Sequence, residues 1–331
     1  MEGFRVVFRA PKLVDVEGFE VEPPKSGRLL VRTVFSLISP GTETAFLMAL
    51  ENTSRIFPQY PGYSNIGIVE EVGDGIGIEG FKPGDLVASS SNHASHVYPK
   101  AEECFKVPEA LSPKEASFFN LGIIALQGVR KSKIELGEPA VVLGLGLIGQ
   151  MASQLLRLDG ALPVIAIDTL DNRLMMAKRL GADYILNPSK MDAEEEVKRL
   201  TDGKGARVVI DATGYPDAIG LAFKLASMRG RVVLLGSTRG LSTVNFYRDV
   251  HRKGLFVIGA HNSIRPSYES SEGYWTRLDD GKTIFKLMAK GMLRCGELIS
   301  RVVKATEAAE AYRLLIEEKD KVLGVLLDWN L

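Results

Sequence analysis

Cysteine is scarce in this chain, which has two, Cys104 and Cys295, among 331 residues. Two thiols so far apart build neither a disulfide framework nor a cysteine-rich zinc site, and we expect both to be reduced. An excess of charge is also missing, because Lys plus Arg and Asp plus Glu each number 41. A balanced charge gives no electrostatic footprint for nucleic acid or for an anionic membrane, so we expect neither as a partner.

Long apolar runs are missing as well. No stretch approaches the roughly 18 residues that a membrane span needs. The first eight residues lack the apolar core and the cleavage site of a signal peptide, so we expect a cytoplasmic protein. The hydrophobic share of 45% and the charged share of 25% are those of an ordinary globular chain, and the length suggests about two domains.

The first third of the chain has a β-rich pattern. Short β-branched and aromatic runs at 28–35, 66–72 and 85–88 are separated by glycine and proline turns, which predicts a small barrel or sandwich. A helix is expected to begin after Ser112, with Pro113 in its first position and Glu115 three residues past the cap.

From about residue 138 to 260 the pattern changes to alternating strands and helices, which build a parallel sheet. The predicted strands lie at 140–143, 164–167, 208–210, 231–235 and 255–258, and the predicted helices at 149–158, 172–180 and 193–200. A loop rich in Ser and Tyr follows at 262–274. Helices at 281–290 and 305–318 and a strand at 321–329 complete the chain.

The sharpest motif is VVLGLGLIG at 141–149. It follows a predicted strand and opens a predicted helix, which is the context that a dinucleotide-binding fingerprint requires. Gly144 would permit the tight turn, Gly146 would let the backbone approach the pyrophosphate, and Gly149 would let helix and strand pack closely. Leu147 and Ile148 would present their N–H groups to the phosphates. The alternative is a glycine turn that binds nothing.

The next predicted strand is followed by Asp168, which lies about 20 residues past the fingerprint, where a carboxylate accepts hydrogen bonds from the adenosine ribose. Its charge would repel a 2′-phosphate, so NAD is expected and NADP is disfavoured, although Arg173 could offset the repulsion. Loops at Thr213 and at Gly236 and Ser237 leave the sheet at its carboxyl edge. They are further candidates for cofactor contact, with ordinary connecting loops as the alternative.

The chain resembles the medium-chain dehydrogenase/reductase superfamily along nearly its whole length. The resemblance rests on PGYSNIGIV at 61–69, Val72-Gly73, FKPGDLV at 81–87, the glycine fingerprint, and KRLGAD at 178–183. It implies an α/β fold in which a GroES-like, β-rich catalytic domain is interrupted by a Rossmann domain with a doubly wound parallel sheet. We expect 1–120 and 262–331 to form the catalytic domain and 121–261 the Rossmann domain. The resemblance also implies a homodimer or homotetramer.

Zinc-dependent members of this superfamily carry Cys, His and Glu where this chain has Ser39, Tyr63 and Ser64. Hydroxyl groups are poor zinc ligands beside thiolate and imidazole, and residues 120–122 supply no third ligand. The short stretch between Val87 and Val107 has no room for the superfamily's four-cysteine zinc lobe. The fold and the NAD site are therefore carried over from the resemblance, and no metal is expected. The segment SPGTE at 39–43 resembles dehydrogenases that act on polyols, sugar acids and bacteriochlorophyllide-type alcohols.

Without a metal, a positioned side chain must take the hydroxyl proton as hydride leaves carbon, while the cofactor carries the hydride. The candidates are Thr42, Glu43, Tyr63 and His93. Thr42 stands near the superfamily's proton-relay hydroxyl, Tyr63 replaces the histidine ligand, Glu43 could polarise its neighbours, and imidazole titrates in the useful range. The structural alternatives are that Thr42 and Glu43 cap a helix and that Tyr63 packs as an ordinary aromatic.

His96 and His261 are two further histidines close to candidate positions. His93 and His96 are three residues apart in strand-like sequence, which predicts opposite faces, one of them exposed, and argues against a shared metal site. His261 and Asn262 follow the last strand of the predicted sheet and either border the ligand cleft or belong to an ordinary loop.

The leading hypothesis is a zinc-independent, NAD-dependent oxidoreductase that interconverts a secondary alcohol, such as a polyol or sugar-derived acid, and its ketone. A zinc-free quinone or enoyl reductase is the second hypothesis, because Ser39-Pro40 resembles the Asn-Pro segment of those enzymes. A non-catalytic dinucleotide-binding protein, such as a redox sensor, is the third.

Overall fold

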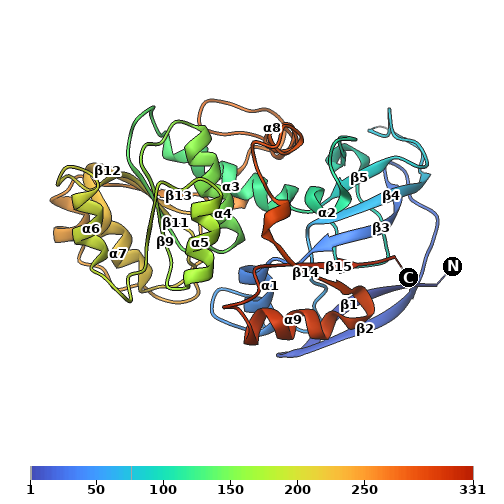
Figure 1. The fold of residues 1–331 in the computed structure, drawn as a ribbon. Helices are drawn as coiled ribbons and strands as arrows, with labels where there is room; N and C mark the ends of the chain where they lie inside the picture. Colours follow the sequence, from blue (N-terminus) through green and yellow to red (C-terminus); the bar gives the residue numbers. More distant parts are fainter. Residues whose placement is uncertain (1, 76, 331) are drawn as a thin grey trace. The chain divides into compact units, whose positions relative to one another are not determined.

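The computed structural model describes residues 2–75 and 77–330, and the chain divides into two compact units (Figure 1). Unit 1 comprises Met1–Leu121 and Gly281–Leu331, and unit 2 comprises Gly122–Asp280. The chain passes from unit 1 to unit 2 after Leu121, one residue from the expected boundary. It returns to unit 1 after Asp280, later than expected, because residues 262–280 group with unit 2 and not with the C-terminal segment of unit 1.

Unit 2 is built on a six-stranded sheet in the order β10-β9-β8-β11-β12-β13, with every neighbouring pair parallel. The chain runs outward from β8 to β10 and then returns to β11 on the other side of β8. This reversal is the topological switch point at which such sheets bind ligands. The strands are β8 (Ala140–Leu143), β9 (Val164–Ile167), β10 (Tyr184–Leu186), β11 (Ala206–Asp211), β12 (Ala226–Leu234) and β13 (Phe256–Gly259).

The helices of unit 2 pack on this sheet (Figure 1). Val141, Val209 and Phe223 lie in the core between the sheet and its helices, and the strands read as continuous apolar runs because both faces of a parallel sheet are covered. The predicted doubly wound parallel sheet is confirmed. The helices are α3 (Phe119–Ser132), which begins in unit 1, and α4 (Leu147–Leu158), α5 (Asp171–Arg179), α6 (Ala193–Arg199) and α7 (Ala218–Leu225).

Unit 1 contains a seven-stranded sheet and a separate hairpin. The sheet has the order β14-β15-β3-β4-β5-β7, with β6 paired to β3. Sequence analysis found its middle strands but not the hairpin or β14. The hairpin is β1 (Glu2–Ala10) and β2 (Leu13–Glu20); the sheet strands are β3 (Leu29–Leu37), β4 (Asn65–Val72), β5 (Leu86–Ser89), β6 (His96–Val97), β7 (Phe105–Lys106), β14 (Ile299–Lys304) and β15 (Gly324–Asp328).

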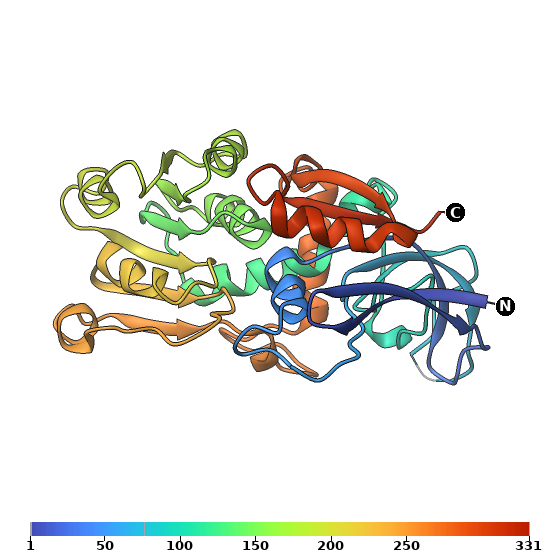
Figure 2. The ribbon, with the colours of Figure 1, turned by 90° about the horizontal axis from the view of Figure 1, so that it is seen from below.

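The C-terminal segment completes the core of unit 1. Strand β15 pairs antiparallel with β3, and α9 (Ala308–Glu317) lies beside β2 and α1 (Pro40–Leu47) (Figure 2). Tyr312 and Trp329 thereby join Phe8 and Ile38 in one buried cluster. The other helices are α2 (Pro113–Ala116), where Ser112 is the N-cap as predicted and accepts a hydrogen bond from the Glu115 amide, and α8 (Arg277–Ala289), which begins in unit 2.

Among the residues that the structure describes, no helix is long and apolar enough to cross a membrane.

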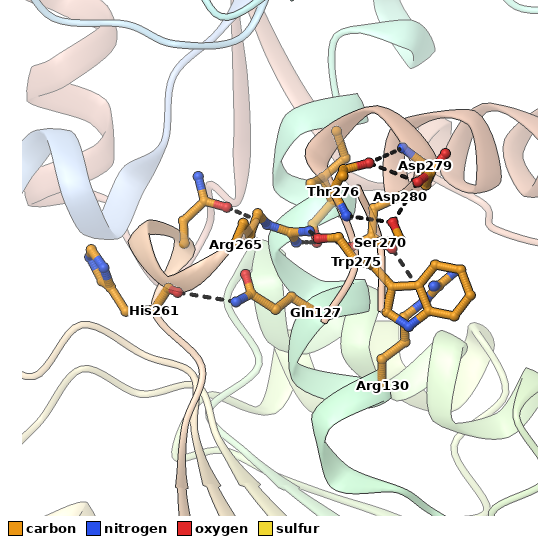
Figure 3. Close-up of polar contacts among 11 residues, drawn as sticks. Gln127, Arg130, His261, Arg265, Ser270, Trp275, Thr276, Asp279 and Asp280 are labelled. Carbon is orange, nitrogen blue, oxygen red and sulfur yellow. Dashed lines mark hydrogen bonds and ion pairs between the residues drawn. The ribbon is translucent and has the colours of Figure 1, made fainter. Parts of the chain in front are cut away.

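The loop rich in Ser and Tyr is fixed within unit 2 by one arginine, Arg265 (Figure 3). Its Nη1 lies 2.5 Å from Oδ2 of Asp280, and its Nη2 donates to the Ile123 carbonyl at 2.7 Å. Its Nε donates to Oδ1 of Asn262, also at 2.7 Å. One guanidinium group therefore joins the start of the loop at Asn262 to α3 and to α8. Lysine, with a single ammonium group, lacks the planar set of donors that makes these three contacts.

The buried carboxylate of Asp280 also pairs with a second arginine. Nε of Arg130 lies 3.2 Å from its Oδ1, and the Arg130 guanidinium stacks 3.7 Å from the ring centre of Trp275 (Figure 3). Burial raises the pKa of Asp280, and the two guanidinium groups oppose that rise. Asp280 is therefore the counterion of two largely buried cations.

Replacing Asp280 should destabilise unit 2 strongly. We expect Asp280→Ala to lower the free energy of unfolding by roughly 3–5 kcal/mol, because two buried guanidinium groups lose their counterion. The control, Glu194→Ala, removes the exposed partner of Lys198 and should cost roughly 0.3–0.5 kcal/mol. The chain has two tryptophans, so urea unfolding in a Trp329→Phe background reports on Trp275 alone. Equal costs for the two variants would contradict this account.

Candidate nucleotide site and buried hydroxyl network

The glycine fingerprint forms a tight loop between β8 and α4. Gly144 has a φ of +88°, in the left-handed region that favours glycine. A Cβ on Gly149 would lie 1.8 Å from the Gly144 carbonyl oxygen, so no side chain fits there. The two glycines therefore perform the turn and the close packing that the sequence predicted for them.

Gly146 has a different surrounding. A Cβ added to it would meet no heavy atom within 4 Å, so its backbone borders open space. It is the N-cap of α4 and has no side chain to hydrogen-bond the first turn. The N–H groups at the start of the helix, including those of Leu147 and Ile148, lack partners inside the helix. This arrangement suits the pyrophosphate of a dinucleotide.

Asp168 lies at the carboxyl end of β9 and is 9% exposed. Its Oδ2 accepts a hydrogen bond from the Leu145 amide at 2.7 Å, and its Oδ1 accepts one from the Leu170 amide at 2.9 Å. These two amides hold the carboxylate beside the glycine loop. Nη1 of Arg173 lies 4.0 Å from Oδ2 of Asp168, so the positive charge of Arg173 is directed at this carboxylate.

The other predicted cofactor residues lie at the same edge of the sheet. A Cβ on Gly144 would lie within 3 Å of Thr213, and one on Gly236 would lie 2.7 Å from the Gly214 amide nitrogen. The loops after β8, β11 and β12 therefore touch one another. Ser237 is exposed on the last of these loops. The predicted cofactor residues on these loops therefore lie at one edge of the sheet, the edge at which such sheets bind ligands.

One carboxyl group at this edge was not among the predicted residues. Asp211, at the end of β11, is fully buried, and its Oδ1 accepts hydrogen bonds from the amide and the hydroxyl of Thr213 at 3.0 and 2.7 Å. Within the described part of the chain its Oδ2 has no hydrogen-bond partner. Burial raises the pKa of Asp211. Asp211 lies two residues before Thr213, at the point where β11 ends and the predicted loop begins.

In unit 1, the catalytic candidates Glu43 and His93 belong to one buried network. Glu43 lies on α1 and is 4% exposed. Its Oε1 accepts the Ser39 amide at 2.8 Å, and its Oε2 accepts the Tyr312 hydroxyl at 2.5 Å and faces Nε2 of His93 at 3.0 Å. Three segments of the chain therefore meet at this carboxyl group.

Tyr63 connects to the same network through Ser39. The Tyr63 hydroxyl donates to Oγ of Ser39 at 2.5 Å, and Ser39 is the N-cap of α1. Tyr63 is half-buried, and its carbonyl accepts from the side-chain amide of Asn120 at 2.5 Å. Thr42 is half-buried one turn into α1, so Thr42 is not the cap of this helix. Glu43 contributes to the cap by accepting from the Ser39 amide.

The expectation that His93 or His96 is exposed is wrong, because their side chains are 0% and 8% exposed. The segment that carries them is covered on both sides, since Ala94 bridges to Arg5 of β1 and His96 pairs with Arg32 of β3. The two rings do have different neighbours. His93 joins the Glu43 network, whereas Nε2 of His96 lies 3.5 Å from Oε2 of Glu70. Burial lowers the pKa of His96.

Other predicted positions lie apart from these clusters. The carbonyl of His261 accepts from Nε2 of Gln127 on α3 at 3.1 Å (Figure 3), and the His261 ring is exposed. Sequence analysis missed Ser36, Tyr312 and Trp329, which belong to the Glu43 network. No local signal marks them, because they reach it from strands and a helix far apart in the sequence.

Comparison with known proteins supports a dehydrogenase assignment. Residues 148–272 match the family model described as zinc-binding dehydrogenase. D-guloside 3-dehydrogenase of Shigella flexneri is 32% identical over 64% of this chain, and the match spans about three fifths of its length (61%). L-threonine 3-dehydrogenase of Pyrococcus horikoshii is 26% identical over 92% of this chain and 91% of its own length.

Solved structures share the fold along the whole chain. A protein of Escherichia coli CFT073 described as a short chain alcohol dehydrogenase, solved with NADH, superposes with a TM-score of 0.85 at 20% identity and covers 99% of both chains. A zinc-binding dehydrogenase of Sinorhizobium meliloti 1021, solved with NADP, gives 0.83 at 22% identity with the same coverage. These two structures show that the fold of the whole chain is that of solved dehydrogenases. The nucleotide-binding part of the chain therefore matches the zinc-binding dehydrogenase family model, and the whole chain shares the fold of a butanediol dehydrogenase of Bacillus subtilis.

The description of the matching family model implies zinc, but the residues of this chain at the corresponding positions do not fit it. The hydroxyls of Ser39 and Tyr63 are hydrogen-bonded to each other, and Oγ of Ser64 donates to the Ser117 carbonyl. Neutral hydroxyls cannot replace the thiolate, imidazole and carboxylate ligands that zinc prefers. In the ranges 2–75 and 77–330, no group of three or more His, Cys, Asp or Glu residues could hold a metal ion.

Two alanine substitutions separate cofactor binding from folding. Gly146→Ala places a methyl group where no atom of the protein lies, at a φ of −66° that alanine adopts freely. We expect it to keep the thermal unfolding temperature but to weaken NADH binding at least about tenfold, because the methyl group blocks the pyrophosphate. Gly149→Ala should lower both the unfolding temperature and the NADH affinity, because its Cβ collides with the Gly144 carbonyl.

The matched control is Gly220→Ala in α7, where a Cβ also meets no neighbour. It should stabilise the helix by up to about 1 kcal/mol and leave NADH binding unchanged. Fluorescence titration with NADH and thermal unfolding measure both quantities. Undiminished NADH binding by Gly146→Ala would show that the dinucleotide does not lie on this loop.

Proposed function

We propose that this protein is an NAD-dependent oxidoreductase that interconverts a secondary alcohol and its ketone without zinc, the alcohol being a polyol or a sugar-derived acid. The observation that carries the proposal is the hydroxyl pair of Tyr63 and Ser39, at the positions where zinc-dependent relatives carry metal ligands. The relatives named as dehydrogenases of a guloside and of threonine support a polar substrate with a secondary hydroxyl group.

The bound nicotinamide would accept or supply the hydride. The protein's own task is then the proton of the substrate hydroxyl. In oxidation, Oη of Tyr63 accepts the substrate proton and passes its own proton to Oγ of Ser39, with which it already shares a hydrogen bond of 2.5 Å. Ser39 in turn releases its hydroxyl proton to water, so that both hydroxyls end neutral. In reduction, the same transfers run in the opposite direction. Thr42, half-buried on α1, is the remaining hydroxyl candidate near this pair.

Glu43 and His93 have a supporting role in this proposal. His93 is fully buried, and its two ring nitrogens face Glu43 and Ser36, so it would act through its neighbours and not on the substrate. Glu43 binds the Ser39 amide and would hold Ser39 in place.

NAD is the proposed cofactor because the Asp168 carboxylate is fixed by two amides and cannot turn away from a 2′-phosphate. Arg173 is directed at that same carboxylate, so the charge of Asp168 offsets it. We propose that Gly144, Gly146, Leu147, Ile148, Gly149, Thr213, Gly236 and Ser237 complete the cofactor site.

A homodimer is part of the proposal. In the described part of the chain, β13 is the last strand of its sheet and pairs only with β12. Phe256 on this edge is 62% exposed, and Val257 is exposed as well. An unpaired edge with exposed apolar residues favours pairing with another chain, and a second copy would continue the sheet.

Removing the charge of Asp168 should relax the choice of cofactor. Asp168→Asn keeps an acceptor for one amide but loses the charge, so we expect the affinity for NADPH to rise about tenfold relative to that for NADH. Asp171→Asn changes an exposed carboxylate on the neighbouring helix, paired with Lys190, and serves as the control. Binding of both cofactors is measured by fluorescence. An equal change in the ratio of NADPH affinity to NADH affinity in both variants would refute a specific role for Asp168.

Removing the Tyr63 hydroxyl should abolish most of the turnover. We expect Tyr63→Phe to lower kcat by roughly 10²- to 10⁴-fold, the contribution typical of a general acid or base, with NADH affinity unchanged. The assay is a panel of polyols and sugar acids with NAD. Turnover of quinones or enoyl substrates with NADPH instead would favour a zinc-free reductase. No turnover by the wild-type protein on any substrate would favour a non-catalytic dinucleotide-binding protein.

A further inference from the structure

We propose that Tyr312, from the C-terminal helix α9, is a positioning residue for the Tyr63–Ser39 hydroxyl pair and acts on it through Glu43. The proposal rests on the proposed function, because it assigns Tyr312 a role in the same proton transfer. Every contact that carries it lies within unit 1.

The Tyr312 hydroxyl is aimed at a single acceptor. The ring is buried in the core of unit 1 and packs edge-on against Phe8, with ring centres 5.0 Å apart at 82°. Its hydroxyl donates to Oε2 of Glu43 at 2.5 Å, across 269 residues of sequence. Burial and the nearby Glu43 carboxyl raise the pKa of Tyr312 well above its ordinary value. The hydroxyl therefore remains a hydrogen-bond donor at any pH at which an alcohol dehydrogenase works.

A second donor reaches Glu43 from the same C-terminal segment by way of His93. The indole nitrogen of Trp329 donates to Oγ of Ser36 at 2.9 Å, and that Oγ lies 2.8 Å from Nδ1 of His93. Because an indole N–H can only donate, Ser36 has its own proton left for Nδ1. His93 then carries its proton on Nε2 and donates to Glu43 at 3.0 Å. This chain fixes the tautomer of a fully buried imidazole.

Glu43 transmits this arrangement to the proposed site. Its Oε1 accepts the Ser39 amide at 2.8 Å, while its own amide donates to the Ser39 carbonyl at 2.9 Å. These two bonds fix the backbone of Ser39 on both sides and so set the position of its Oγ, which accepts the Tyr63 hydroxyl. Without Tyr312, a buried carboxyl group loses one of three donors, and its remaining bonds must readjust. Small displacements of reacting hydroxyls cost large factors in rate.

The test compares Tyr312→Phe with Tyr98→Phe. Both variants remove one phenolic oxygen from unit 1, but the Tyr98 hydroxyl accepts the Glu22 amide near the surface, away from the Glu43 network. We expect Tyr312→Phe to lower kcat by roughly tenfold to a hundredfold, while KM and NADH affinity stay within about twofold of the wild-type values. We also expect a shift in the apparent pKa of the kcat–pH profile that depends on Tyr63, which is the pKa that Tyr63→Phe removes from the profile. Tyr98→Phe should leave kcat and the pH profile unchanged.

A second measurement does not depend on turnover. The chain has nine tyrosines, so the Cζ signals of ¹³C-labelled tyrosine can be assigned by substitution, and the titration of Tyr63 followed directly. We expect the Tyr63 titration to shift in Tyr312→Phe and, in the same direction, in Trp329→Phe. An unchanged titration together with an unchanged pH profile would overturn the proposal. A wild-type protein without turnover would refute the proposed function, while the Tyr63 titration would still decide whether Tyr312 positions it.

If Tyr312→Phe loses NADH binding or its cooperative thermal unfolding, its kinetics report on folding. Trp329→Phe then decides the matter, because it removes a donor from the opposite end of the network without touching Glu43. A fall in kcat with a shifted pH profile would support the proposal, and a wild-type profile would overturn it.

Discussion

The carboxyl group of Glu43 is the constraint on which the organisation of unit 1 depends. A buried carboxyl group without hydrogen-bond partners would destabilise a fold whose net stability is small. Here three donors satisfy it, from Ser39 before α1, from His93 in the segment that precedes β6, and from Tyr312 on α9. The segment after residue 280 is therefore needed for the hydroxyl network as well as for the hydrophobic core. The network cannot form until the last part of the chain has folded onto the first.

Unit 2 meets a different requirement, which is to leave backbone groups of its glycine loop free for the proposed cofactor. Gly146 borders open space, and no side chain caps the first turn of α4. The Leu145 amide, by contrast, is taken by Asp168. Together with the Leu170 amide, this hydrogen bond fixes the carboxylate next to the loop, so the proposed phosphate and ribose recognition are coupled in one short stretch of structure. The proposed cofactor site would thus be preorganised for its ligand.

In the proposed mechanism, hydroxyl groups do part of the work that a metal ion would do. Zinc polarises the substrate oxygen as a Lewis acid and lowers the pKa of what it binds. A hydroxyl pair supplies proton transfer but no comparable charge, and such transfer contributes roughly 10²- to 10⁴-fold in rate. Precise orientation must then supply more of the acceleration. This requirement gives a physical reason for a rigid network behind Ser39 and Tyr63.

The sequence predicted those parts of the fold that local chemistry determines. Strands β8 and β9 lie at the predicted residues, and the glycine loop and Asp168 lie together, because apolar runs and glycine turns act over a few residues. The β1–β2 hairpin was missed, since Lys12 takes the left-handed turn conformation where glycine or asparagine would signal a hairpin. The environments of His93 and His96 were misjudged because β1 and β3 cover that segment from both sides.

The Glu43 network lay beyond sequence reasoning for the same kind of reason. Ser36 and Trp329 are 293 residues apart, and no periodicity links a strand residue to a C-terminal indole. Glu43 and His93 were named as candidates from their residue types and from positions matched to the superfamily. That they share one hydrogen bond, and that Tyr312 and Ser39 complete the set, follows only from how β15 and α9 pack on the first strands.

The central claim is that this protein, which resembles zinc-type dehydrogenases, works through hydroxyl groups and without zinc. The most direct test is elemental analysis of chelator-washed protein, with NAD-dependent turnover measured on the same sample. The account predicts far less than one zinc ion per chain and turnover equal to that of the untreated protein. Stoichiometric zinc, with activity lost on its removal and restored on its return, would contradict it.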